Sequence, residues 1–190
     1  WRLLHEVEDS KITDILNQTT HIYISHEHPD HFSPPFFLNK KVKNILISKK
    51  IEILFQHTKD KRVSNFLRKH GFMVKELDSG KKMKLDKDVE IQVIKHDFYD
   101  SSIIVKTPDA RILNLNDCPL RDPREISKFK KKYGTFDVLF SQFSYAAWKG
   151  GVNNKNFRED AAEEKLKSIE AQANILKCKS VIPFASFIYF

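Results

Sequence analysis

The segment "ISHEHPDHFS", residues 24–33, gathers three histidines and an aspartate directly after a short apolar run. In an extended chain, residues two apart point the same way, so His26 and His28 can aim their imidazoles at one point. Asp30 and His31, which follow a proline bend, can aim at a second point nearby. Imidazole nitrogens and carboxylate oxygens are ligands of zinc and of non-haem iron or manganese. The segment therefore predicts a site for one or two divalent metal ions, with zinc favoured and iron or manganese as alternatives.

Two candidates for further ligands lie where predicted strands end. His96 follows the apolar run at 89–94, and Asp117 follows the run at 111–116. On an α/β scaffold, functional side chains often lie where a strand exits into a loop. We therefore expect both residues to join the donors of the loop. Four histidines lack such a setting and are not predicted to bind metal: His5, His21, His57 and His70.

Asp30 has two candidate roles besides a structural one. Its carboxylate can bind a second metal, or it can orient a metal-bound water and accept its proton as the catalytic base. The structural alternative is an N-terminal cap for a helix that begins near Ser33, where Pro34 is suited to the first helical position.

The 190 residues carry a formal net charge of +8, with lysines in several clusters. This charge predicts an anionic small-molecule substrate with a phosphate or a nucleotide, although a solvated basic surface is an alternative of similar weight. Nucleic acid is not favoured, because no interleaved aromatic and basic motif is present. No apolar run is long enough to cross a membrane. Two cysteines offer no disulfide framework, which indicates a reduced, cytoplasmic compartment.

Strand-like and helix-like segments alternate along the chain, which predicts an α/β fold. The predicted strands cover residues 21–25, 44–48, 73–77, 82–85, 89–94, 101–107, 111–116, 136–141 and 180–184. Helices are predicted from Pro34 for a short distance, over 59–71, from Pro123 to Gly134 and over 157–177. The strands between 73 and 117 are expected to form a meander, with residues 108–110 as a hairpin turn.

The residues His26-Glu27-His28-Pro29-Asp30-His31 have the H-x-H-x-D-H form of the metallo-β-lactamase superfamily, which the chain resembles. Within it, the chain most resembles the metallo-β-lactamase-like domain of CMP-N-acetylneuraminate hydroxylases. The stretches that carry this likeness are "WRLLHE", "IYISHEHPDHFS", "ARILNLNDCPLR", "FSQFSYAAW" and "VIPFASF". The resemblance implies a metallo-β-lactamase-like αββα sandwich. It also implies that His26, His28 and His96 hold one metal and that Asp30 and His31 hold a second, with Asp117 shared.

The resemblance also implies parts that this sequence does not contain. The superfamily pattern has strands ahead of Trp1 and one more histidine near Phe190, so residues 1–190 are expected to be a single partial domain, truncated at both ends. The resemblance to the hydroxylases implies a two-part protein with a Rieske iron–sulfur domain as its electron entry. Such a centre needs paired cysteine and histidine ligands, and residues 1–190 do not provide them. An oxygenase of this type would therefore need electrons from a separate partner or from a domain outside these residues.

Several functions fit these observations. The first is a metal-dependent hydrolase that uses a metal-bound hydroxide on a phosphate- or nucleotide-linked substrate. The alternative is an iron-dependent monooxygenase component similar to the CMP-sialic-acid hydroxylases. A nuclease or a non-catalytic binding module has less support. Residues after the strand at 136–141 are candidates to line the substrate pocket, unless this loop is only a packed connection: Ser141, Gln142, Ser144, Tyr145 and Trp148.

Overall fold

The computed structural model describes residues 8–96, 99–118, 120–143 and 150–184. By its internal contacts the chain divides into two compact units. The first contains the described residues up to Lys81 together with Tyr99 and Asp100, and the second contains Lys82–His96 and the described residues from Ser101 onward. The expectation of a single domain over residues 1–190 stays a prediction.

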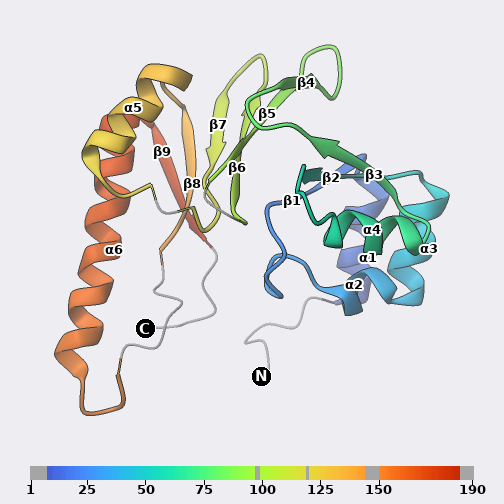
Figure 1. Ribbon diagram of the computed structural model, residues 1–190, viewed down its shortest axis with the longest axis horizontal. Helices are drawn as coiled ribbons and strands as arrows, with labels where there is room; N and C mark the ends of the chain where they lie inside the picture. Colours follow the sequence, from blue (N-terminus) through green and yellow to red (C-terminus); the bar gives the residue numbers. More distant parts are fainter. Residues whose placement is uncertain (1–7, 97–98, 119, 144–149, 185–190) are drawn as a thin grey trace. The chain divides into compact units, whose positions relative to one another are not determined.

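The first unit is a parallel three-stranded sheet with four helices (Figure 1). The strands, in sheet order, are β1 (His21–Ile24), β2 (Glu52–Gln56) and β3 (Met73–Leu77). The helices are α1 (Asp9–Gln18), α2 (Pro34–Leu38), α3 (Lys40–Ser48) and α4 (Arg62–Lys69). Helices connect the successive parallel strands, as parallel pairing requires a crossover. The central strand β2 is buried from Ile53 to Gln56 and is correspondingly apolar.

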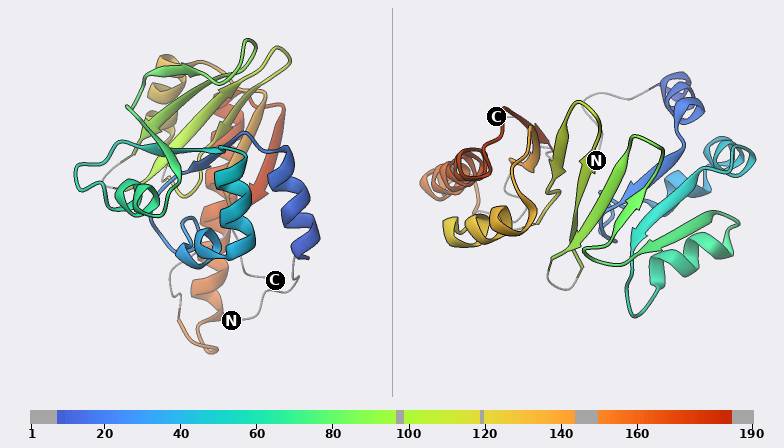
Figure 2. Two further views of the ribbon diagram at one scale, coloured as in Figure 1. Left: turned by 90° about the vertical axis from the view of Figure 1, so that its right-hand side faces the viewer. Right: turned by 90° about the horizontal axis from the view of Figure 1, so that it is seen from above.

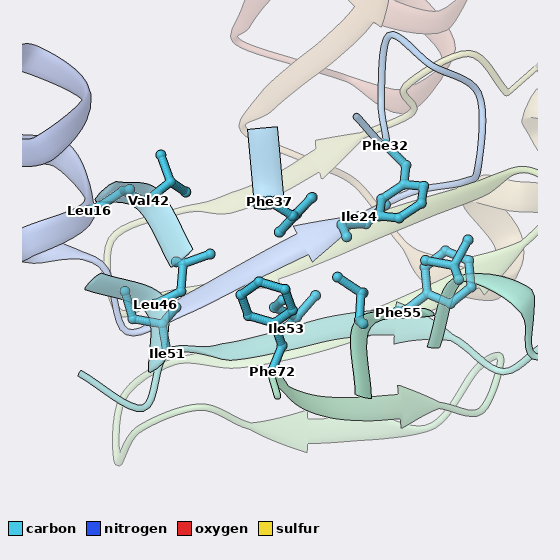
Figure 3. Close-up of a cluster of buried hydrophobic side chains, with 12 residues drawn as sticks. Leu16, Ile24, Phe32, Phe37, Val42, Leu46, Ile51, Ile53, Phe55 and Phe72 are labelled. Carbon is cyan, nitrogen blue, oxygen red and sulfur yellow. The ribbon is translucent and has the colours of Figure 1, made fainter. Parts of the chain in front are cut away.

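The core of the first unit is a cluster of aliphatic and aromatic side chains between the sheet and its helices. Figure 3 shows Ile24 and Ile53, from neighbouring strands, beside the rings of Phe37 and Phe72. Ile53 is completely buried. Burying such a side chain contributes about 1.5–3 kcal/mol, so this cluster is the main stabilising feature of the unit.

Residues 44–48 are helical, and the prediction of a strand there is wrong. They form the second half of α3, whose buried stripe contains Val42 and Leu46, with Ile45 packed against the cluster. Spacings of three and four residues place these side chains on one helix face. The Asn39 side chain caps the helix by accepting hydrogen bonds from the backbone amides of Lys41 and Val42. A short apolar run does not distinguish a strand from a buried helix turn.

The second unit is a six-stranded sheet with two helices (Figures 1 and 2). The strands, in sheet order, are β4 (Lys82–Lys84), β5 (Glu90–Lys95), β6 (Ser101–Lys106), β7 (Arg111–Asn114), β8 (Val138–Gln142) and β9 (Ser180–Phe184). The helices are α5 (Pro123–Tyr133) and α6 (Lys155–Leu176), which lie on the same face of the sheet. Pairing is antiparallel from β4 to β7 and parallel from β7 to β9.

Local signals fix the ends of α5. Asp122 occupies its N-cap position and accepts a hydrogen bond from the Arg124 amide, with Pro123 at the first helical position. The helix ends at Gly134, whose φ of +85° is readily adopted only without a side chain. Its buried residues Ile126 and Phe129 pack in a cluster that also contains residues of the strands and of α6.

Most predicted elements are confirmed, and three elements among the described residues were not predicted. The helices near Pro34, over 59–71, from Pro123 and over 157–177 are present, as are the strands other than 44–48. Sequence patterns did not indicate α1, α3 or β2. The expected meander is also divided, because β3 pairs with β2 in the parallel sheet and the antiparallel meander begins at β4. Among the described helices, none is both long and apolar enough to cross a bilayer.

Candidate metal centre

The loop after β1 is a compact turn that is anchored in the core. The backbone amides of His31 and Phe32 both donate to the carbonyl of His28, at 2.9 and 2.7 Å. Phe32 is buried, and its ring packs against those of Phe37 and Phe66. This combination of a closed turn and an aromatic anchor holds the polar side chains of the loop in place.

Two imidazoles of the loop meet at their ring nitrogens. His26 Nε2 lies 2.8 Å from His28 Nδ1, and the two rings are nearly perpendicular. In a tetrahedral site, Zn–N bonds of about 2.0–2.1 Å separate two ligand nitrogens by about 3.3 Å. A slight increase in the distance between these two nitrogens would therefore make room for a metal ion. His26 is only 1% exposed, so its ring is held within the fold.

The second pair of donors lies in the same turn. His31 Nε2 is 3.6 Å from Asp30 Oδ2, and the His31 ring centroid is 4.2 Å from that of His26. The Asp30 side chain is 40% exposed, so its carboxylate remains accessible to solvent or substrate. Ser33 occupies the N-cap position of α2, although its side chain makes no capping hydrogen bond. The structure thus gives no support to Asp30 as the helix cap.

Neighbouring polar groups orient the histidine rings. Ser25 Oγ lies 3.0 Å from His26 Nδ1 and 3.2 Å from His31 Nδ1. Asp100 Oδ1 is 3.7 Å from the same nitrogen of His26. Gln56, the last residue of β2, donates its side-chain amide to the carbonyl of Ser25 at 3.1 Å and also to that of Tyr99. Such outer contacts, which fix the orientation of metal-binding rings, are typical of metal sites.

An ion-pair group lies at the rim of the loop. Arg62 bonds Glu27 and Asp60, each at 2.7 Å. The hydrogen bond from Arg62 holds the pKa of Asp60 below its ordinary value, and the hydrogen bond to Asp60 raises the pKa of Arg62. Glu27 is therefore paired with a cation, and it is not one of the candidate metal donors of the same segment.

The donor set of the first unit fits a divalent metal. Three imidazoles and one carboxylate lie within a single turn, the ring of His26 is buried, and the Nδ1 atoms of two rings are engaged by a neighbouring hydroxyl. Nitrogen and oxygen donors of this kind suit zinc, iron and manganese, and they do not distinguish among these metals.

In the second unit, His96 and Asp117 lie at the same edge of the six-stranded sheet. Strands β5 and β7 both pair antiparallel with β6, so they run in the same direction and end at the same edge. His96 follows β5, and Asp117 lies in the turn after β7. Asn116, with φ of +51°, donates its side-chain amide to the carbonyl of Ser101 at this edge.

The His96 ring is oriented within its own unit. Its Nε2 lies 2.8 Å from the hydroxyl of Ser102, which is fully buried, and the ring stacks on Phe129. Asp117 is partly buried. The convergence of these two residues with the donors of the first unit stays a prediction.

The residues predicted to contact substrate have different environments. Ser141 is buried and donates its hydroxyl to Gln172 Oε1, while the Gln172 amide donates to the carbonyl of Leu120. These hydrogen bonds connect β8 to α6, and they give the buried hydroxyl of Ser141 a structural partner. Gln142 accepts a hydrogen bond from Lys165 at 2.8 Å. A substrate role for these two residues stays a prediction; Ser144, Tyr145 and Trp148 lie outside the described residues.

Sequence reasoning missed the residues that support the candidate donors. Ser25 and Ser102 contact histidine rings directly, and Gln56 and Asp100 reach the loop from other segments. Only Ser25 carried a local signal, because it directly precedes His26. The others are identified by their positions in the fold.

No family model matches the chain, and neither does any curated protein sequence. Similar solved structures exist at low identity. CmlA, a diiron β-hydroxylase from Streptomyces venezuelae, matches with a TM-score of 0.60 and 15% identity over 85% of this chain and 34% of its own. Human tRNase Z, short form (ELAC1), matches with a TM-score of 0.55 and 14% identity, covering 91% of this chain and 79% of its own.

A third similar structure names the fold directly. The metallo-β-lactamase fold protein YhfI from Bacillus subtilis matches with a TM-score of 0.55 and 12% identity, covering 93% of this chain and 80% of its own. The chain therefore has the metallo-β-lactamase fold, as its histidine motif predicts. It spans about a third of the length of the CmlA chains that it matches, 35% and 34%.

Proposed function

We propose that the protein is a metal-dependent hydrolase whose metal is held by the loop after β1. The observation that carries this proposal is the meeting of His26 Nε2 and His28 Nδ1 at 2.8 Å, with His31 and Asp30 in the same turn. His96 and Asp117 would complete the donor set from the edge of the second sheet. Zinc is the favoured metal, because its ligands are commonly histidine and aspartate.

A bound divalent ion would lower the pKa of a water molecule toward about 7 and polarise the attacked group. Asp30 has the properties needed to work beside it. Its carboxylate is partly exposed and lies next to His31, so it can accept a hydrogen bond from a water molecule and hold it for attack. His26 is buried and oriented by Ser25, which makes it a fixed donor.

The proposed substrate is an anionic small molecule with a phosphate or a nucleotide. The support is the formal net charge of +8, which attracts anions over roughly 8–10 Å at physiological ionic strength. Lys165 and Arg121 help to line a narrow cleft beside Asp117 in the second unit. A fall of kcat/KM with added salt would support this assignment. If kcat/KM did not change with salt, the positive charge would serve solubility and not substrate binding.

The second candidate is an iron-dependent oxygenase component similar to the CMP-sialic-acid hydroxylases. The observation that favours it is the likeness to CmlA, which is a diiron β-hydroxylase with the same fold. Its donor set would be the same loop, with iron in place of zinc and electrons from a separate partner protein. Metal analysis of the purified protein distinguishes the two: bound iron with turnover that depends on a reductant supports the oxygenase, and zinc with hydrolysis in the absence of a reductant supports the hydrolase.

Other functions have weaker support. A nuclease rests on the positive charge and on the fold shared with human tRNase Z, and a non-catalytic binding module is the remaining alternative. A cytoplasmic location is also part of the proposal, based on the absence of a disulfide framework in the sequence.

The proposal can be tested with a simple anionic ester. The purified protein would be loaded with Zn²⁺ and assayed for hydrolysis of bis(4-nitrophenyl) phosphate, a phosphodiester probe. We expect hydrolysis that is lost in the His26→Ala, His28→Ala double variant and retained in His57→Ala, a matched change of an exposed histidine. Equal activity in the double variant and the wild type would overturn the proposal.

A further inference from the structure

We propose that Ser25 is a positioning residue that couples the two halves of the donor set, because one hydroxyl orients both His26 and His31. This inference rests on the proposed metal site, since it concerns the rings that would hold the ions. Ser25 Oγ lies 3.0 Å from Nδ1 of His26 and 3.2 Å from Nδ1 of His31. Both contacts are within hydrogen-bond range, and both reach the same type of ring nitrogen.

The chemistry of a hydroxyl suits this double contact. A serine oxygen has two lone pairs, so it can accept an N–H from each of two rings at once. A neutral imidazole that donates through Nδ1–H has an unprotonated Nε2, and that lone pair is the one that binds a metal. Ser25 therefore selects, in both histidines, the tautomer that presents Nε2.

The positions of the two Nε2 atoms agree with this assignment. His26 Nε2 is the atom that meets His28 Nδ1, and His31 Nε2 is the atom nearest to Asp30 Oδ2. Each ring thus turns its Nδ1 toward Ser25 and its Nε2 toward a different partner donor. One serine would consequently support the His26–His28 pair and the Asp30–His31 pair together.

Ser25 is itself held in place by the first sheet. It is 4% exposed, and its carbonyl accepts the side-chain amide of Gln56 at 3.1 Å. Gln56 is 1% exposed and is the last residue of the neighbouring strand β2. The hydroxyl is thereby positioned by the end of a rigid strand pair, as a support for metal-binding rings needs to be.

Asp100 provides a natural comparison, because its carboxylate lies near the ring of His26. Its Oδ1 lies 3.7 Å from Nδ1 of His26. Loss of an outer partner of a ligand costs roughly 10–100-fold in metal affinity. Removing the Ser25 hydroxyl should therefore weaken binding at both halves of the donor set, whereas removing the Asp100 charge should weaken chiefly the half that contains His26.

The experiment compares four variants with the wild-type protein: Ser25→Ala, Ser25→Thr, Asp100→Asn and Ser64→Ala. Ser64 is a matched control, since it is a fully buried serine of the same unit whose hydroxyl bonds Glu76. Binding of Zn²⁺ is followed by competition with a chelating dye, and folding is checked by circular dichroism. Long-range ¹H–¹⁵N spectra of the metal-free proteins report which nitrogen of each histidine carries the proton.

We expect Nδ1–H tautomers of His26 and His31 in the wild type. In Ser25→Ala we expect a loss of that preference and a fall of about 10–100-fold in affinity for each bound ion. Ser25→Thr, which retains the hydroxyl, should restore the tautomers, and Ser64→Ala should bind zinc as the wild type does. Nε2–H tautomers in the wild type, or unchanged tautomers and affinity in a folded Ser25→Ala variant, would overturn the inference. A wild type that binds no zinc would instead overturn the proposed function, while the tautomer spectra would still test the role of Ser25.

Discussion

The loop after β1 places four candidate donors within six residues, whereas the six-stranded sheet carries its two candidates at the ends of separate strands, β5 and β7. In the loop, a single turn closed on the carbonyl of His28 sets the positions of the side chains. In the sheet, the common direction of β5 and β7 brings His96 and Asp117 to one edge.

The two arrangements depend on different parts of the structure. The loop donors depend on a local turn and on the anchor Phe32, so they can form wherever the first unit folds. His96 and Asp117 depend on the pairing of both their strands with β6, and thus on the whole sheet. Changes in the loop should therefore alter chemistry with little effect on stability, and changes in the sheet core should alter stability first.

The largest expected effect belongs to Asp30→Asn, which keeps the size of the side chain and removes its charge. Loss of a group that orients water or accepts its proton typically lowers kcat about 10²–10⁴-fold. We expect a fall in this range for hydrolysis of bis(4-nitrophenyl) phosphate, with an unchanged denaturation midpoint because the side chain is 40% exposed. Unchanged turnover would remove Asp30 from the chemistry.

A core substitution should destabilise chiefly the unit that carries it. Leu46→Ala in the first unit and Leu139→Ala in the second each remove a side chain that is at most 1% exposed. Each should lower the free energy of unfolding by about 2–5 kcal/mol. Hydrogen exchange with mass spectrometry should show the loss of protection in the unit that carries the change. The matched controls Ile15→Ala and Leu166→Ala alter exposed side chains and should have much smaller effects.

Helix caps should have a smaller effect, of similar size in both units. Asn39 accepts hydrogen bonds from the amides of Lys41 and Val42 in α3, and Asp122 accepts one from Arg124 in α5. Replacing either cap by alanine should cost about 1 kcal/mol, measured by urea denaturation. Ser33→Ala serves as the control, since its side chain makes no capping hydrogen bond. An equal loss in Ser33→Ala would contradict this account of the caps.

The smallest effect concerns Asp137, which joins neighbouring strands of the second unit. The hydrogen bond from Lys179, and then that from the Arg111 amide, hold its pKa below the ordinary value of 3.8. A carboxyl with a lowered pKa in the folded state stabilises above its unfolded value, and this contribution is lost as the pH falls through the folded pKa. Asp137→Asn should therefore melt slightly below the wild type at pH 7, and the difference should shrink below pH 3.8. A difference that does not depend on pH would contradict an electrostatic origin.

The sequence predicted most of the second sheet and the grouping of polar side chains after β1, because their signals are local. The spacing of His26, His28, Asp30 and His31 indicates candidate donors, whose binding of a metal stays a prediction, and the Asp122-Pro123 pair marks the start of α5. Residues 44–48 were assigned wrongly because a short apolar run fits either a strand or a buried helix face, and the cap at Asn39 was not recognised. The role of Gln56 could not be predicted, since its contact with Ser25 joins residues far apart in sequence.

The central claim is that residues 26–31 bind a divalent metal, and a zinc titration tests it most directly. The wild type, His26→Ala and His57→Ala would be titrated with Zn²⁺ against a chelating dye under the same conditions. His57 is the control because its side chain is 49% exposed and pairs with Asp78 outside the loop. We predict that the wild type and His57→Ala bind zinc equally and that His26→Ala loses more than about 100-fold in affinity, beyond the range of an outer-contact change. Equal zinc binding by His26→Ala and the wild type would contradict the account.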